Sequence, residues 1–145
     1  MKLLLASISS RAPADGLAEV YLDRTAQYTQ TEARVYRSET ALLESVEKLR
    51  ARAAPVLVLL DSRGKMLSSE EFAAWIGRQR DDGVQQLIFA IGPADGWSNN
   101  ARKHARLLLS LGAMTLPHEL ARVVLAEQVY RAFTILAGHP YHSGH

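Results

Sequence analysis

The stretch that decides the fold is the apolar run Val56-Leu57-Val58-Leu59-Leu60, which follows Pro55. Consecutive apolar residues without alternation are typical of a strand that is covered on both faces, as in a parallel sheet. A second run of this kind lies at Leu87-Ile88-Phe89-Ala90-Ile91. Longer stretches of helical periodicity separate the apolar runs. The sequence therefore predicts an α/β domain with a mostly parallel sheet and helices on both faces.

The rest of the chain fits this alternation. Ser68 and Glu71 have the spacing of a capping box, which predicts a helix from there to about Arg80. The other expected strands are 2–9, 33–36 (an edge strand) and 113–116, and the other expected helices are 15–27, 40–52, 99–109 and 117–137. A turn is expected at 61–65 and a turn-rich loop at 92–96.

Composition bounds the class of protein. A chain of 145 residues suits one domain covering 1–145, and 48% hydrophobic with 22% charged residues indicates a folded chain rather than a disordered one. The absence of cysteine excludes disulfides, thiolate metal sites and a thiol nucleophile. No apolar run is long enough to span a bilayer, and the opening run is too short for a signal peptide. We therefore expect no membrane association and a cytoplasmic location.

Charge and histidine are concentrated toward the carboxyl end. The net charge is only +2, yet from residue 101 onward five Lys and Arg residues stand against two acids. Such a surface could contact phosphate, although a solvated face explains the same charges. All five histidines lie between His104 and His145. The sequence thus favours a working site in the last third of the chain.

Three connections are candidates for ligand binding, because ligands of open α/β sheets bind beyond the carboxyl ends of strands. They are Leu60–Lys65, Gly92–Gly96 and Leu111–Leu116. Neither a dinucleotide-binding nor a P-loop glycine motif is present. Asp61 at a strand end is compatible with a phospho-accepting receiver domain, but the first strand is not followed by the acidic pair that such a site needs.

The final helix and the tail carry the remaining candidate groups. Glu127 lies within the apolar stripe of the helix, and Arg131 is four residues later, so we expect an ion pair. His139 and His142 flank Pro140 with no carboxylate nearby in sequence, which argues against a metal site. Tyr141 and His142 could instead stack on a base or move a proton. A frayed terminus is the alternative reading.

The chain resembles the RlmH (YbeA-like) family within the SPOUT class of knotted methyltransferases. The resemblance covers residues 55–142 in family order, and the first third matches only loosely. The stretches that carry it are Leu60-Asp61-Ser62-Arg63-Gly64-Lys65, Leu67-Ser68-Ser69-Glu70-Glu71-Phe72, Phe89-Ala90-Ile91-Gly92, Met114-Thr115-Leu116-Pro117-His118, Glu127-Gln128-Val129-Tyr130-Arg131-Ala132-Phe133 and His139-Pro140-Tyr141-His142.

This resemblance implies a SPOUT-type α/β-knot with a C-terminal trefoil knot at about 85–145, a homodimer and S-adenosylmethionine as cofactor. It implies methylation at N3 of a pseudouridine in 23S ribosomal RNA on the assembled ribosome, and no metal. The cofactor contacts carried over by position are Leu60, Gly92, Leu111, Gly112, Ala113, Met114, Thr115 and Leu116.

Methylation of a ring nitrogen needs deprotonation and no covalent enzyme intermediate, which agrees with a chain without cysteine. We expect His142 to assist the deprotonation, and Tyr141 and Arg131 to place the nucleotide. His118, at the start of the last helix, is the second candidate for the base.

Two positions depart from the family pattern. Pro93 replaces the second glycine of Ile-Gly-Gly, which removes a backbone donor, and Ser143-Gly144-His145 replaces a basic residue after His142. The alternatives left open are a non-catalytic nucleotide-binding module, a SPOUT methyltransferase acting on tRNA, and a dimer that has lost activity.

Overall fold

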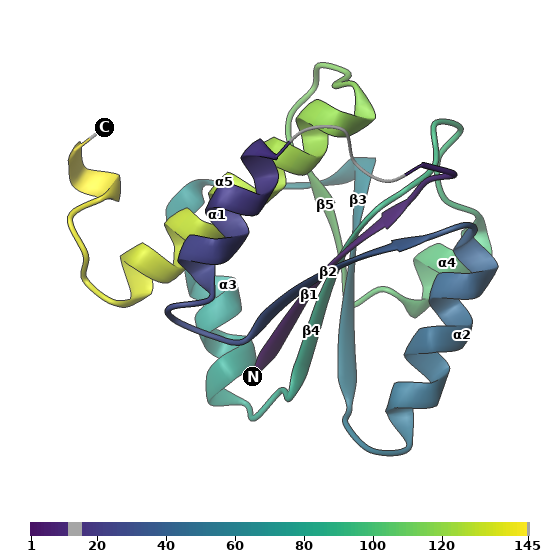
Figure 1. Ribbon diagram of the computed structural model, residues 1–145, viewed down its shortest axis with the longest axis horizontal. Helices are drawn as coiled ribbons and strands as arrows, with labels where there is room; N and C mark the ends of the chain where they lie inside the picture. Colours follow the sequence, from purple (N-terminus) through teal and green to yellow (C-terminus); the bar gives the residue numbers. More distant parts are fainter. Residues whose placement is uncertain (12–15, 145) are drawn as a thin grey trace.

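The computed structural model describes residues 1–11 and 16–144, which form a five-stranded parallel sheet with helices on both faces (Figure 1). The strand order is β2-β1-β4-β3-β5, and each neighbouring pair is parallel. The strands are β1 (Lys2–Ile8), β2 (Thr31–Tyr36), β3 (Pro55–Met66), β4 (Gln86–Ile91) and β5 (Leu107–Ser110). The helices are α1 (Leu17–Thr25), α2 (Glu39–Arg50), α3 (Ser69–Asp81), α4 (Asn99–His104), α5 (His118–Leu136) and the short 3-10 helix η1 (His142–Gly144).

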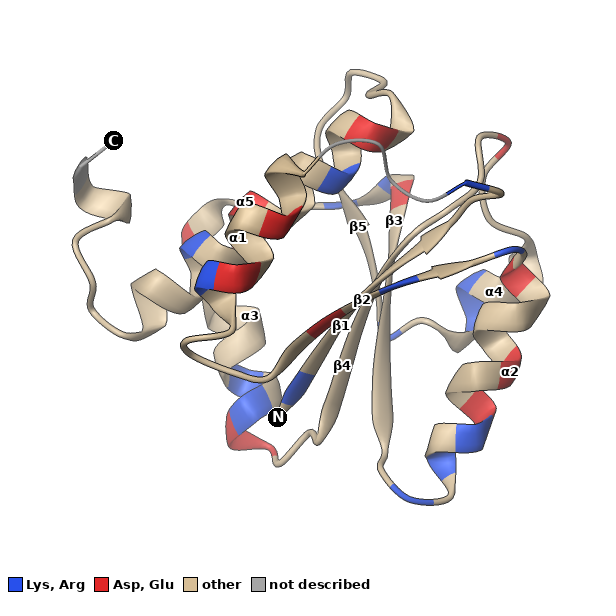
Figure 2. Cartoon of the chain, in the orientation of Figure 1, with Lys and Arg blue, Asp and Glu red and all other residues tan. Residues whose placement is uncertain are grey.

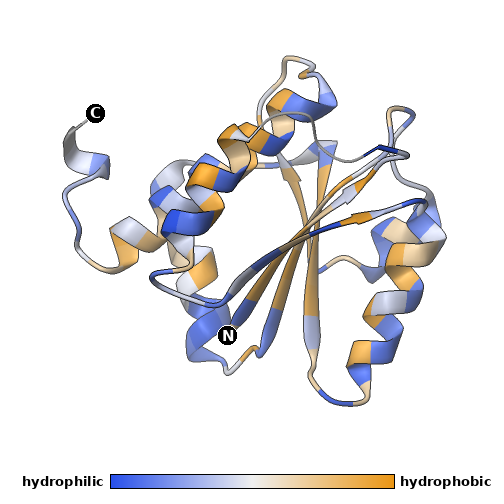
Figure 3. Cartoon of the chain, in the orientation of Figure 1, coloured by the Kyte–Doolittle hydropathy of each residue, from blue (hydrophilic) through white to orange (hydrophobic). Residues whose placement is uncertain are grey.

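The two faces of the sheet pack against different helices. Side chains of α1, α3 and α5 cover one face, where they surround Phe89 and Val58 of the central strands. Side chains of α2 and α4 cover the other face, where they surround Ile88 and Leu57. The central strand β4 is uncharged and, apart from Gln86, apolar, whereas edge strand β2 carries Glu32 and Arg34 and many other charges lie on the helices (Figures 2 and 3). The predicted α/β fold, with a parallel sheet covered on both sides, is confirmed.

Local signals place several elements as expected. The Ser68 hydroxyl accepts a hydrogen bond from the Glu71 backbone N–H, and the Glu71 carboxylate accepts one from the Ser68 N–H. This capping box starts α3 where the sequence predicts it. The predicted edge strand is also confirmed, because β2 pairs only with β1. The expected start of the first helix at Asp15 lies outside the described residues.

The expectation that β3 ends in a turn at 61–65 is wrong. β3 runs on to Met66, and it leaves β5 only between Leu60 and Lys65, which both pair with Leu109. Gly64 allows β3 to pair with β5 again at Lys65, since a Cβ at Gly64 would lie 2.5 Å from the backbone carbonyl carbon of Leu108. Only glycine permits this close approach of the two backbones. The residues that predict a turn form a bulge in a longer strand.

The expected helix at 99–109 and the expected strand at 113–116 are also wrong. α4 ends at His104, and the last strand is Leu107–Ser110, so residues 113–116 form a loop. The three leucines of β5 extend the helical pattern of α4, and local periodicity cannot separate them. Pairing with β3, about fifty residues earlier in the chain, makes them a strand. The knot implied by the family resemblance stays a prediction.

Gly64→Ala should destabilise the protein by about 1–3 kcal/mol, because the added methyl group collides with backbone that cannot move aside as a side chain would. Urea unfolding followed by circular dichroism measures the loss. Gly16→Ala is the matched control, since no atom of the residues that the structure describes lies within 4 Å of a Cβ there and its φ is −85°. Equal stability of Gly64→Ala and Gly16→Ala would contradict the assigned strand contact.

Candidate active site

The three predicted ligand loops meet at the carboxyl-terminal end of the sheet. β4, β3 and β5 are parallel neighbours, so their carboxyl ends point the same way. Leu60 lies where β3 leaves β5, Gly92 follows β4, and Leu111–Leu116 follows β5. This is the position at which open α/β sheets bind ligands. The structure thus brings all the predicted cofactor residues to the carboxyl-terminal end of the sheet.

The loop between β5 and α5 offers backbone donors to a ligand. Within the described part of the chain, the amides of residues 113–116 donate no hydrogen bond to another protein group. The start of the loop is fixed, because the Ser110 hydroxyl donates to the Gly112 carbonyl at 3.0 Å and accepts from the Gly112 amide at 3.2 Å. Gly112 has a φ of +144°, a conformation that favours glycine. Adenosyl and carboxylate groups are recognised by exposed amides of this kind.

A cavity of about 170 Å³ lies beside this loop. Its walls come from the β3–α3 connection, the end of β5 and the middle of α5, and they combine apolar side chains with polar groups that include the hydroxyl of Ser69 and the amide of Gln128. These two side chains are hydrogen bonded to each other at 2.7 Å. Leu111 of the predicted cofactor loop also lines the cavity, which extends the candidate site inward from the edge of the sheet.

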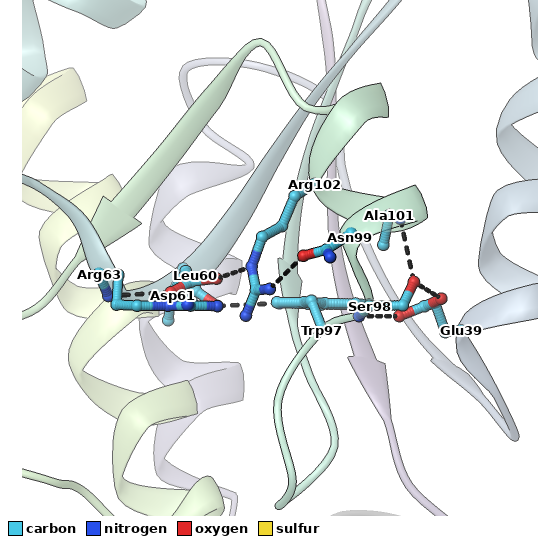
Figure 4. Close-up of polar contacts among 9 residues, drawn as sticks. All are labelled: Glu39, Leu60, Asp61, Arg63, Trp97, Ser98, Asn99, Ala101 and Arg102. Atoms are coloured by element: carbon cyan, nitrogen blue, oxygen red, sulfur yellow. Dashed lines mark hydrogen bonds and ion pairs between the residues drawn. The ribbon is translucent and has the colours of Figure 1, made fainter.

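Trp97 connects two of the predicted cofactor positions (Figure 4). Its Nε1–H donates to the Leu60 carbonyl at 2.8 Å. Its ring also covers Gly92, where a Cβ would lie 2.7 Å from the Trp97 Cε2 atom. Gly92 is therefore required for close packing against the indole.

Hydrogen bonds of Ser98 and an ion pair of Arg102 anchor the segment after Trp97 (Figure 4). The Glu39 carboxylate at the start of α2 accepts hydrogen bonds from the backbone N–H and the hydroxyl of Ser98. Arg102 of α4 donates its Nε–H to Asp61 at 2.7 Å and an Nη1–H to Asn99 at 3.1 Å. The β4–α4 loop is thereby tied to α2 and to the bulge of β3.

Asp61 is a buried carboxylate with a structural explanation. Burial by itself raises the pKa of a carboxyl group, but the hydrogen bonds from Arg102 and from the Arg63 backbone outweigh it and lower the pKa of Asp61. The side chain is 4% exposed and paired with Arg102. Both carboxylate oxygens of Asp61 thus accept hydrogen bonds that fix the β3 bulge. This agrees with the sequence argument against a phospho-accepting site.

A second polar cluster forms around Glu127 in the middle of α5. Arg131 donates to both carboxylate oxygens of Glu127, at 3.2 Å and 2.9 Å, which confirms the expected ion pair. The Tyr141 hydroxyl donates to the same carboxylate at 2.7 Å. The Arg131 guanidinium also lies 5.0 Å from the centre of the Tyr141 ring. The structure thus brings together Arg131 and Tyr141, the two residues that the sequence analysis expects to place the nucleotide.

His142 joins this cluster through both ring nitrogens. Arg131 Nη1 lies 2.9 Å from Nδ1 of His142, and Glu70 Oε1 lies 2.7 Å from Nε2. A guanidinium only donates hydrogen bonds, so Nδ1 accepts and the proton of the neutral ring is on Nε2, facing the carboxylate. His142 can accept a further proton only after Nδ1 separates from Arg131.

Tyr141 is held in its protonated form. Burial, followed by the hydrogen bond to Glu127, raises the pKa of Tyr141 from 10.0 to about 12. A phenol with this pKa donates hydrogen bonds at neutral pH and does not act as a base. Its place beside Arg131 suits it to orient a nucleotide.

His118, the second candidate for the base, lies apart from this cluster at the start of α5. Its side chain is 28% exposed, its Nδ1 is 4.0 Å from Glu119, and its buried Nε2 has no hydrogen-bond partner among the described residues. Glu127 is nine residues further along α5, or about 13 Å along the helix axis. The structure therefore separates His118 from the tail cluster along α5.

Two further absences concern the described residues. Residues 1–11 and 16–144 contain no group of three or more His, Asp or Glu side chains arranged to hold a metal ion, and His145 lies outside them. None of the helices in this part of the chain is long and apolar enough to cross a membrane.

The sequence argument missed several residues of the site. Glu70 contacts His142 across 72 positions, and Trp97 contacts Leu60 across 37 positions. Neither contact leaves a local pattern. A signal that could have pointed to Trp97 is the bulky aromatic side chain next to a glycine-rich loop.

Comparisons with known proteins agree with this geometry. The family model described as "Predicted SPOUT methyltransferase" matches residues 1–142. The ribosomal RNA large subunit methyltransferase H of Koribacter versatilis is 58% identical over 125 residues, which cover 86% of this chain and 85% of that protein. The protein of the same name from Brucella ovis is 62% identical over 86 residues, 59% of this chain and 51% of that protein. This chain therefore belongs to the SPOUT methyltransferase family, and the predicted family is confirmed.

Solved structures are similar in fold at low sequence identity. The SpoU methyltransferase AviRb from Streptomyces viridochromogenes, in complex with AdoMet, matches with a TM-score of 0.50 and 16% identity over 96% of this chain and 58% of that chain. AviRb without a named cofactor matches with a TM-score of 0.51 and 16% identity over 95% of this chain and 61% of that chain. The chain thus spans about three fifths of the AviRb chains, and this likeness supports the fold.

The raised pKa of Tyr141 can be tested by titration. In a protein labelled at tyrosine ¹³Cζ, the resonance that disappears in Tyr141→Phe should titrate near pH 12. Glu127→Gln should lower this pKa toward 10, because the anionic acceptor is lost. Since the folded-state pKa is the higher one, the phenol's contribution to stability is full below pH 10 and is lost as the pH rises through about 12.

Glu119→Gln, an exposed acid on the same helix, is the matched control and should leave the titration unchanged. A Tyr141 resonance that titrates near 10 in the wild-type protein would show that the tail does not contact Glu127 in solution.

Proposed function

We propose that this chain is an S-adenosylmethionine-dependent methyltransferase that methylates N3 of a pseudouridine in 23S ribosomal RNA on the assembled ribosome. Membership of the SPOUT family supports methyl transfer, and the name of the Koribacter relative supports large-subunit ribosomal RNA as the substrate. The observation that carries the proposal is the meeting of Leu60, Gly92 and the free amides of 113–116 at one edge of the sheet.

The residues at this edge fit the proposed cofactor. Leu60, Gly92 and Leu111–Leu116 would hold it, with exposed amides for its polar groups and the apolar side chains of the adjoining cavity for its uncharged parts. When bound, S-adenosylmethionine supplies an electrophilic methyl group. No metal is required by this reaction.

The chain's own groups account for the rest of the chemistry. Nδ1 of His142 would take the proton from the N3 nitrogen of the target base, which would leave N3 able to accept the methyl group that S-adenosylmethionine would supply. Nδ1 becomes available when Arg131 turns from the ring to an RNA phosphate. Tyr141, whose hydroxyl hydrogen is donated to Glu127, orients the nucleotide by ring stacking or by accepting a hydrogen bond. A base positioned in this way contributes roughly 10²–10⁴-fold to the rate.

We propose further that the active form is a homodimer. Val20 on α1 and Leu120 on α5 are 43% and 48% exposed, although the two helices pack together. A second copy would cover these apolar side chains. It would also bring its own tail cluster to the cofactor loop of the first copy.

The proposed partner is the ribosome rather than free RNA. A net charge of +2 is too small for strong binding to naked RNA. The shape of the assembled ribosome would have to supply the affinity, which places the enzyme in the cytoplasm.

Methyl transfer from labelled S-adenosylmethionine to ribosomes that lack the modification tests this function. The wild-type protein should transfer about one methyl group per ribosome, and His142→Ala should lower kcat by about 10²–10⁴-fold with little change in cofactor affinity. The product nucleoside, identified by mass spectrometry, should be an N3-methylpseudouridine.

His104→Ala is the matched control, because His104 lies on α4 away from the tail cluster. Full activity of His142→Ala would exclude His142 as the base. Equal activity on protein-free ribosomal RNA would contradict the requirement for the ribosome, and no transfer by the wild-type protein would contradict the function.

A mixing experiment tests whether the site is shared between subunits. Gly112→Val distorts the cofactor loop, because a φ of +144° disfavours any side chain, and His142→Ala changes the tail. Each variant alone should be nearly inactive. Mixed and reassociated at equal amounts, they should recover about a quarter of the wild-type activity, because half of the dimers are mixed and each mixed dimer has one intact site.

Light scattering establishes the mass of each sample. A monomeric wild-type protein would contradict the proposed dimer. A dimer whose mixed form recovers no activity would place loop and tail of the same subunit in one site.

A further inference from the structure

Trp97 touches two of the three backbone segments that line the proposed cofactor site. Its side chain is 4% exposed, and its Nε1–H donates to the Leu60 carbonyl at 2.8 Å (Figure 4). Its ring lies against Gly92 so closely that a Cβ would be 2.8 Å from Nε1. One rigid side chain therefore sets the distance between the bulge of β3 and the start of the β4–α4 loop.

The chain on either side of Trp97 is also fixed. Before it, the Gly96 amide donates to the Pro93 carbonyl at 2.9 Å, which closes a turn. After it, Ser98 is bound to Glu39 of α2 by two hydrogen bonds. Pro93 has no amide hydrogen with which to hold the loop. The indole contact is thus the direct link between this loop and β3 at the cofactor edge.

The neighbouring ion pair holds the other end of the same contact. Arg102, one turn after Ser98, reaches Asp61, the residue that follows Leu60 in β3. Leu60 and Asp61 are thereby held by successive groups of the β4–α4 segment, one through its carbonyl and one through its side chain (Figure 4). Movement of the loop relative to β3 would have to break both contacts.

We propose that Trp97 is a positioning residue for the methyl donor, because its indole holds the Leu60 carbonyl and the Gly92 backbone at the spacing that the cofactor requires before the cofactor arrives. This inference rests on the proposed function of these loops as the S-adenosylmethionine site. A preorganised site avoids the cost of ordering its loops on binding. Trp97 is buried behind Gly92, so it acts through the two backbone segments and not on the reacting atoms.

Trp97→Phe tests the proposal, because it keeps an aromatic ring at this position, removes the N–H donor to Leu60 and shortens the side chain that packs against Gly92. Loss of one hydrogen bond that orients the site should weaken S-adenosylmethionine binding by roughly 5-fold in calorimetry. The KM for the cofactor should rise by the same factor, while kcat on ribosomes stays within about twofold. Trp97→Ala, which also loses the contact with Gly92, should bind more weakly still.

Trp75→Phe is the matched control, because it makes the same change at the other of the protein's two tryptophans, on α3. It should leave cofactor affinity unchanged. Wild-type binding together with equal affinity in Trp97→Phe would overturn the role of Trp97 and leave the proposed function standing. Failure of the wild-type protein to bind S-adenosylmethionine would remove both.

Fluorescence of Trp75→Phe tests preorganisation without altering Trp97, which is then the only indole. Acrylamide should quench it weakly in the free protein, as expected of a side chain that is 4% exposed, and saturating S-adenosylmethionine should change the quenching little. Strong quenching that disappears only when the cofactor binds would show that the loop is ordered by the ligand, and would overturn the proposal.

Discussion

The site depends on the close approach of two backbones, that of Gly64 in β3 and that of Leu108–Leu109 in β5. Because nothing larger than hydrogen fits between them, β5 can pair with β3 both before and after the bulge. This pairing fixes where β5 ends and hence where the loop 111–116 begins. Without it, the amides of that loop would not lie at the edge where Leu60 and Gly92 lie. A constraint between distant parts of the backbone thus positions the proposed cofactor site.

Two polar networks hold the site on either side of this contact. One ties the β4–α4 loop to β3 and α2 through Trp97 and Arg102. Its buried carboxylate, Asp61, is paired with an arginine, as a carboxylate in that position must be. The other network collects the tail on α5 around Glu127, where the carboxylate keeps Tyr141 protonated. The first network serves to fix backbone, and the second keeps side chains ready for a substrate.

Local patterns predict much of this fold, and distant contacts account for the failures. The capping box at Ser68 and the apolar central strands are visible in a few consecutive residues, and the structure confirms them. The strand 107–110 is not, because its leucines continue the helical pattern of α4 and become a strand only by pairing with β3. The Glu127–Arg131 pair follows from helical spacing, whereas the contacts of Trp97 and of Glu70 join residues far apart in sequence.

The central claim is that backbone at the carboxyl ends of β3, β4 and β5 encloses the methyl donor. Hydrogen–deuterium exchange with and without S-adenosylmethionine tests it most directly. We predict that the cofactor slows exchange in peptides covering 60–66, 92–98 and 111–116 and leaves those of β2 and α2 unchanged. A separate cavity lies near the amino ends of β1 and β2 and is lined by residues that include Met1, Tyr28 and Arg80. Protection concentrated there instead would contradict the account.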